Sequence, residues 1–88
     1  MTLKNLLQIA KESLHIYVDL AKDSPSEAYY WNACICGVRR MTIDSIDWFS
    51  ETVSKDELDE AYDDLDEAYD QTRKEIDHIY KEASCSKD

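Results

Sequence analysis

The chain has 88 residues, and 20 acidic against 10 basic side chains give it a formal net charge of -10. Direct binding to nucleic acid or to an anionic membrane is not expected, because both depend on lysine and arginine. One glycine in the whole sequence is also too few for a loop that cradles phosphates.

The first predicted helix covers residues 3–22. Its apolar residues recur at alternating spacings of four and three, which places them on one face of a helix. Thr2 is in position to cap the start of this helix. At its end, Ser24 and Glu27 have the spacing of a capping box, and Pro25 suits a first helical position. A second helix is therefore expected to begin at Pro25.

The second predicted helix covers residues 25–53, and its first turns are apolar around most of the circumference. A helix of this kind is usually covered on more than one side. Glycine costs about 1 kcal/mol relative to alanine within a helix, so we expect a kink or a break between Gly37 and Thr42. Three apolar residues are candidates for the core or for a homodimer contact: Trp31, Ile35 and Phe49.

The third predicted helix covers residues 55–83 and is followed by a frayed tail at 84–88. It opens with a second capping box, formed by Ser54 and Glu57. Residues 58–71 are two tandem heptads that agree at six of seven positions. Such a repeat keeps leucine, alanine and tyrosine on one side, facing a partner helix.

Together these segments predict an all-α fold class, a small antiparallel three-helix bundle that forms a single domain over residues 1–83. A helix of about 28 residues is about 42 Å long, so the bundle is expected to be elongated. A core this thin gives little stability to a chain of this length.

The negative charge is concentrated in the third predicted helix. Residues 1–41 carry five basic and four acidic side chains, whereas residues 42–88 carry five basic and sixteen acidic ones. Nine of the fifteen residues from 56 to 70 are acidic, and all nine fall outside the leucine, alanine and tyrosine side. These candidate partner-binding residues are Asp56, Glu57, Asp59, Glu60, Asp63, Asp64, Asp66, Glu67 and Asp70.

The charge density of this segment approaches that of DNA. Fourteen helical steps cover about 21 Å, or about one carboxylate per 2.3 Å, against about one phosphate charge per 1.7 Å of duplex. Five like-charge pairs four residues apart destabilise the helix by about 1 to 2.5 kcal/mol. A solvated face, a binding surface for a basic partner and a cation site all remain open as interpretations.

We expect a non-catalytic inhibitor without a cofactor, which binds the basic groove of a nucleic-acid-binding protein by presenting charge like that of DNA or RNA. In charge and size, though in no motif, the chain resembles phage-encoded inhibitors of host restriction and CRISPR machinery. No Cys-His or Ser-His-acid arrangement indicates nucleophilic catalysis. The alternative is a helical homodimerisation or adaptor module whose acidic face is only solvated.

A metal-binding bundle is the third interpretation. The only two histidines form Glu-x-x-His pairs, Glu12 with His15 and Glu75 with His78, and each pair shares one face of a helix. The first pair lies on the outer side of its helix, which counts against a shared site. The two cysteines in residues 34–36 point about 160° apart on a helix and are expected to be small buried hydrophobes rather than ligands.

The expected location is the cytoplasm, which would be the host-cell cytoplasm for a phage-encoded protein. No apolar run reaches the roughly 18 to 20 residues that span a bilayer. The amino-terminal segment lacks the unbroken apolar region of a signal peptide, and three cysteines without an export signal are typical of reduced thiols.

Overall fold

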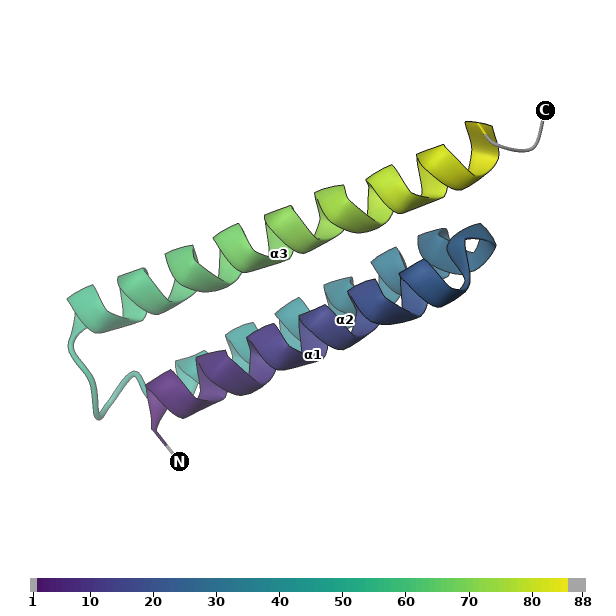
Figure 1. Cartoon of the computed structure of the whole chain (residues 1–88). Coiled ribbons are helices and arrows are strands. Elements are labelled where there is room, and N and C mark those ends of the chain that lie inside the picture. The colour runs from purple at the N-terminus through teal and green to yellow at the C-terminus, as the bar shows by residue number, and fades with distance from the viewer. Residues whose placement is uncertain (1, 86–88) are drawn as a thin grey trace.

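The computed structural model describes residues 2–85, which form three long α-helices and one short 3-10 helix. The elements are α1 (Leu3–Asp23), η1 (Pro25–Glu27), α2 (Ala28–Asp47) and α3 (Lys55–Cys85). The chain reverses between α1 and α2 and again between α2 and α3, and the bundle measures 54 × 18 × 15 Å (Figure 1). This confirms an all-α helical bundle. Within the described range there is no strand, and no helix is long and apolar enough to cross a membrane.

Two of the predicted N-caps are present. The backbone N–H of Asn5 donates to Thr2 Oγ1 at 3.1 Å, and that of Glu57 donates to Ser54 Oγ at 3.2 Å. Each bond satisfies one of the backbone donors left free at the start of a helix. α1 and α3 therefore begin at the predicted residues.

The ends of these two helices lie slightly beyond their predicted positions. α1 ends one residue later than predicted, and α3 continues to Cys85, two residues past the predicted end. Residues 84 and 85 are thus helical and not part of a frayed tail. The rest of that predicted tail, residues 86–88, lies outside the described residues.

The second helix begins later than predicted, because residues 25–27 form a 3-10 turn before it. The predicted capping box is wrong, since the Ser24 side chain makes no capping bond. The Ser24 carbonyl instead accepts the Glu27 N–H at 2.9 Å, which closes the tighter turn. Pro25 occupies the first position of this turn, where its missing N–H is not needed.

The second helix also ends early, at Asp47 rather than at Val53. Residues 48–53 form successive turns, in which Phe49 N–H donates to the Ile46 carbonyl at 2.9 Å. Phe49 and Val53 are half-buried in this link. Their helix-like spacing in the sequence therefore reflects burial in the turn that reverses the chain, and not a continuing helix.

α2 is uninterrupted from Ala28 to Asp47, so the break predicted between Gly37 and Thr42 is absent and a kink is not confirmed. A Cβ at Gly37 would meet nothing within 4 Å, so no close approach requires glycine there. Thr42 is buried, and its hydroxyl donates to the Val38 carbonyl at 2.7 Å within the helix. Packing of α2 against both neighbours outweighs the intrinsic cost of one glycine.

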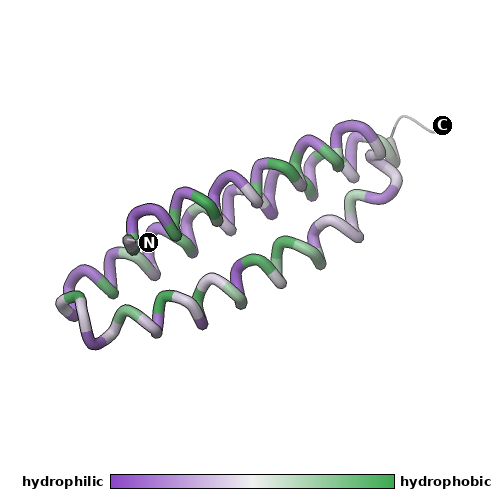
Figure 2. Tube along the Cα trace, turned by 90° about the horizontal axis from the view of Figure 1, so that it is seen from below, coloured by the Kyte–Doolittle hydropathy of each residue, from purple (hydrophilic) through white to green (hydrophobic). Residues whose placement is uncertain are grey.

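The core consists of two clusters along the bundle. The cluster near the α1–α2 link contains Leu14, Val18, Ala21, Ala28, Ile35 and Ile76. The cluster near the α2–α3 link contains Ala10, Ile46, Ala61 and Leu65. Trp31 is half-buried against the first cluster, with its ring 5.8 Å from that of Tyr17. Hydrophobic and neutral residues make up most of α2, which contacts both other helices (Figure 2).

Candidate acidic binding surface

The nine acids predicted to bind a partner all lie on α3, and none of them is buried. Two of them face the neighbouring helices. Asp64 pairs with Lys11 of α1 at 2.7 Å, and Asp66 accepts from Nε and Nη2 of Arg39 of α2, both at 2.9 Å. These two carboxylates therefore stabilise the packing of α3 and are compensated by cations from elsewhere in the chain.

Asp70 is compensated within α3 itself. Its carboxylate accepts from Lys74 at 3.0 Å and lies 3.5 Å from Arg73. The hydrogen bond from Lys74 lowers the pKa of Asp70, and the positive charges of Lys74 and Arg73 lower it further. Asp70 thus stays ionised to a lower pH than a free aspartate. Its two cations, Arg73 and Lys74, follow the acidic segment in the sequence.

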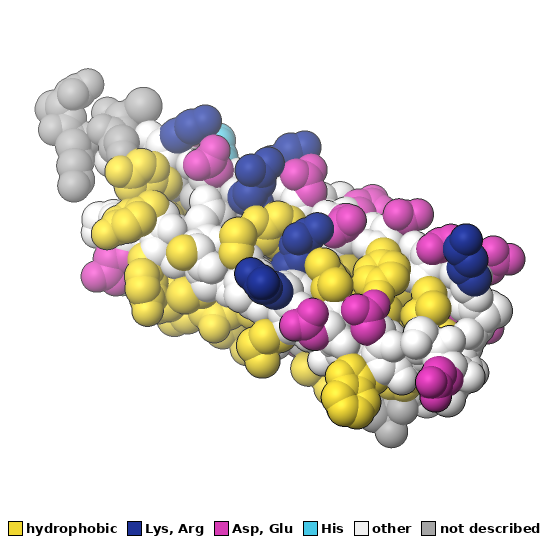
Figure 3. Space-filling view, turned by 180° about the vertical axis from the view of Figure 1, so that it is seen from behind, with side chains coloured by type: hydrophobic (Ala, Val, Ile, Leu, Met, Phe, Trp, Pro, Cys, Tyr) yellow, Lys and Arg dark blue, Asp and Glu magenta, His cyan; other side chains and the backbone are white. Residues whose placement is uncertain are grey.

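The other six acids form no ion pair with any residue in the described part of the chain. Leu65 points into the core. Asp63 and Glu67 are two residues before and after it, so their side chains point about 160° away from that of Leu65. These six acids span eleven helical steps, or about 17 Å. Figure 3 shows acidic side chains along the edge formed by α3. We call these six residues the outward acidic row: Asp56, Glu57, Asp59, Glu60, Asp63 and Glu67.

Two tyrosines of the heptads fasten α3 to α2. The Tyr62 hydroxyl donates to Asp47 Oδ1, and this hydrogen bond, followed by burial and nearby carboxylates, raises the pKa of Tyr62 to about 12. The Tyr69 hydroxyl lies 2.8 Å from Cys36 Sγ, and the Arg39 guanidinium carbon lies 5.4 Å from the ring centre. The contact with Cys36 and burial raise the pKa of Tyr69. Cys36 is exposed, so its predicted burial is wrong.

We expect Tyr62 to ionise at a higher pH than an ordinary tyrosine. Its folded-state pKa of about 12 exceeds the ordinary 10.0, so its contribution to stability is complete below pH 10 and is lost as the pH rises toward 12. A spectrophotometric titration of tyrosinate in wild type and in Tyr62→Phe checks this, with circular dichroism to follow the helices. A difference between the two curves centred near pH 10 would contradict the assignment.

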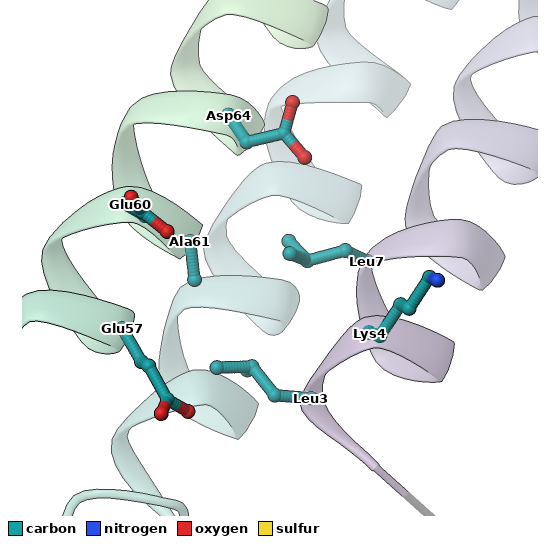
Figure 4. Close-up of a pocket in the computed structure, with 7 residues that line it drawn as sticks. All are labelled: Leu3, Lys4, Leu7, Glu57, Glu60, Ala61 and Asp64. Carbon is teal, nitrogen blue, oxygen red and sulfur yellow. The ribbon is translucent and has the colours of Figure 1, made fainter. Parts of the chain in front are cut away.

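A cavity of about 360 Å³ lies between the amino-terminal turns of α1 and α3. Figure 4 shows Leu3 and Leu7 of α1 and Ala61 of α3 between the two helices, with the carboxylates of α3 at the edge. Those carboxylates belong to Glu57, Glu60 and Asp64. Lys4 of α1 lines the cavity as well. The cavity combines an apolar floor with a charged rim of three carboxylates and one lysine, and it joins segments that lie far apart in the sequence.

The candidate metal ligands do not come together. Glu75 lies beside Lys22 of α1, 3.9 Å from its Nζ, and Lys22 is ten residues, or about 15 Å, along the helix from Glu12. His15 and His78 are exposed and lie near carboxylates of their own helices. Across the described residues, no group of three or more His, Cys, Asp or Glu side chains could hold a metal ion.

The chain was compared with models of protein families, with curated proteins and with solved structures. None of these comparisons finds a match. The function is therefore argued from the geometry of the chain's own surface.

Proposed function

We propose that this protein is a non-catalytic inhibitor whose outward acidic row occupies the basic groove of a nucleic-acid-binding protein and competes there with DNA or RNA. The observation that carries the proposal is a row of six carboxylates, about 17 Å long, that has no compensating cation among the residues the structure describes. A groove that neutralises phosphates presents lysine and arginine along its length. Carboxylates held on a helix offer those cations matching charge without a cost of ordering the backbone.

The energetic cost of the row supports a binding role. Three like-charge pairs within it are four residues apart and destabilise α3 by about 0.6 to 1.5 kcal/mol. These pairs are Asp56 with Glu60, Asp59 with Asp63, and Asp63 with Glu67. A helix that needed only to be soluble would gain the same energy by interspersing lysines. A basic partner would remove the repulsion, so the energy stored in the row favours the complex.

The cavity between α1 and α3 also supports binding to a basic partner. A lysine or arginine side chain has an apolar stem and a cationic end. The cavity has matching parts, with leucine and alanine at its floor (Figure 4). Its rim carries Lys4 and three carboxylates, of which Glu57 and Glu60 have no ion pair among the described residues and Asp64 pairs with Lys11. A basic side chain of the partner could therefore anchor there while neighbouring cations follow the acidic row.

Nucleases of restriction and CRISPR systems are suitable partners, because they hold nucleic acid in basic grooves. Such a partner would place the protein in the cytoplasm of the cell that contains the nuclease. The adaptor interpretation predicts instead that the acidic row is only solvated and contributes nothing to binding.

The test compares two variants with equal net charge. In the row variant, four acids become amides: Asp59→Asn, Glu60→Gln, Asp63→Asn and Glu67→Gln. The control variant neutralises four exposed acids outside α3: Asp19→Asn, Asp23→Asn, Asp44→Asn and Glu51→Gln. Each protein is immobilised and exposed to an extract of the native host. We expect the wild type and the control to retain the same partner, and the row variant to bind it at least about 100-fold more weakly.

The retained partner must also be a nucleic-acid-binding protein. Excess duplex DNA or RNA should release it from the immobilised protein, and raising the salt concentration should weaken binding steeply. Retention of the same partner by the row variant would overturn the proposal. Retention that neither nucleic acid nor high salt reduces would overturn it as well.

A further inference from the structure

A second surface lies on the side of the bundle away from α3, and it consists of exposed hydrophobic side chains. Ile9 and Ile16 of α1 are 48% and 57% exposed, and Met41 and Trp48 are 72% and 86% exposed. Ile9 and Ile16 are seven residues apart, so they lie on one side of α1. Met41 lies on α2, and Trp48 directly follows the last residue of that helix. Figure 3 shows hydrophobic side chains gathered along the edge opposite the acidic α3 edge.

A shallow groove of about 210 Å³ runs between these two rows. Four residues from each helix line it, and none of the eight is charged. Three of the eight, Ser13, Thr42 and Ser45, carry hydroxyl groups, so the groove is uncharged rather than wholly apolar. Together with the exposed isoleucines and Met41, it forms the kind of surface that marks an interaction site. We call this surface the α1–α2 face, and its main apolar members are Leu6, Ile9, Ile16, Val38, Met41 and Trp48.

The distribution of charge favours a second copy of the chain as the occupant of this face. α1 carries three lysines and three acids, and α2 carries two arginines and two aspartates, so each helix is neutral in sum. Two of the α1 lysines, Lys11 and Lys22, pair with carboxylates of α3. The surplus negative charge lies almost entirely on α3. Two copies that meet through their α1–α2 faces therefore keep their acidic helices on opposite outer sides, where solvent and salt screen the repulsion.

We infer that the protein forms a homodimer through the α1–α2 face, with a two-fold axis parallel to the helices. In this arrangement α1 of each copy packs against α2 of the other. Glu12 and Arg40 do not line the groove, but each directly precedes a residue that does, Ser13 on α1 and Met41 on α2. Both therefore belong to turns at the level of the groove. The two-fold axis places Glu12 of one copy beside Arg40 of the other. Arg40 forms no ion pair with any described residue of its own chain.

The size of the face matches a reversible dimer. Helices of 20 and 21 residues are about 30 Å long, and two packed helices are about 18 Å wide. The flat area is about 540 Å² per copy, or about 1,100 Å² for both copies, near the lower limit of specific interfaces. A dimer that dissociates on dilution is therefore expected. This inference does not depend on the proposed function, because α3 stays exposed in the dimer.

The test is sedimentation equilibrium over a range of protein concentrations, in a reducing buffer that prevents disulfide-linked dimers. The wild type should show a dimer mass. Ile16→Glu and Met41→Glu, at exposed positions, should keep the helical circular dichroism of the wild type. Because of the two-fold symmetry, each substitution buries two carboxylates in the interface and should weaken the dimer at least about 100-fold. The matched control is Tyr29→Glu, at a 67% exposed tyrosine that packs against Tyr80 of α3 instead.

A charge exchange tests the arrangement of the two copies. Arg40→Glu alone should weaken the dimer, and adding Glu12→Arg should restore it. A wild type that stays monomeric at every concentration would overturn the inference. A dimer that Ile16→Glu and Met41→Glu leave unchanged would overturn it too, and so would a charge exchange that fails to restore dimerisation.

Discussion

Replacing Leu65 with alanine is expected to lower the free energy of unfolding by about 2 to 5 kcal/mol. Leu65 is fully buried in the cluster near the α2–α3 link, where two of its three companions are alanines. The larger side chains packed against this cluster are only partly buried, and the substitution leaves a cavity between them. The total stability of an 88-residue chain is about 4 to 13 kcal/mol. The loss is therefore a large part of the whole.

Urea unfolding followed by circular dichroism measures this loss. Leu58→Ala is the matched control, because the same change occurs one heptad earlier on the same helix at a half-buried position. We expect a clearly smaller loss for the control. Equal losses at the two positions would show that α3 does not pack through Leu65 as described.

The row variant is expected to be more stable than the wild type by about 0.8 to 2 kcal/mol, because it removes four like-charge pairs on α3. The opposite result is expected for Asp66→Asn, since this substitution breaks the ion pair with Arg39. That loss should reach at most about 1 kcal/mol, because both side chains are partly exposed. Both replace carboxylates of α3 with amides, but only Asp66 has a cation from another helix, so the expected effects have opposite signs.

Urea unfolding at low and high salt measures both effects. Added salt should stabilise the wild type and reduce its difference from the row variant, because it screens the repulsion between exposed carboxylates. A row variant that is less stable than the wild type at low salt would show that these acids are compensated. The like-charge repulsion that supports an acidic binding surface would then be absent.

The helices that were predicted most accurately are those with local signals. The apolar periodicity of α1 and α3 and the caps at Thr2 and Ser54 involve residues within a few positions of one another. The second helix was predicted less accurately, because its limits depend on where the chain must reverse. Phe49 continues the apolar spacing and yet lies in a turn, since burial at the end of the bundle also selects apolar residues.

The acidic residues of α3 likewise show which properties follow from local sequence and which depend on the tertiary structure. All nine acids were identified from the sequence, together with their separation from the leucine, alanine and tyrosine side of α3. Which of them are compensated was not predictable, because Lys11 and Arg39 are 53 and 27 residues away from Asp64 and Asp66. The exposed Ile9 and Ile16 were not singled out, since they lie beside the stripe that forms the core.

The sequence by itself determined the all-α class, the starts of α1 and α3, and the concentration of negative charge on one helix. These properties depend on composition and on spacing along one helix. Only the tertiary structure decided which carboxylates stay without a cation and which hydrophobic face stays uncovered. Ion pairs and burial between helices depend on register and on rotation about each helix axis, and packing of the whole bundle sets both.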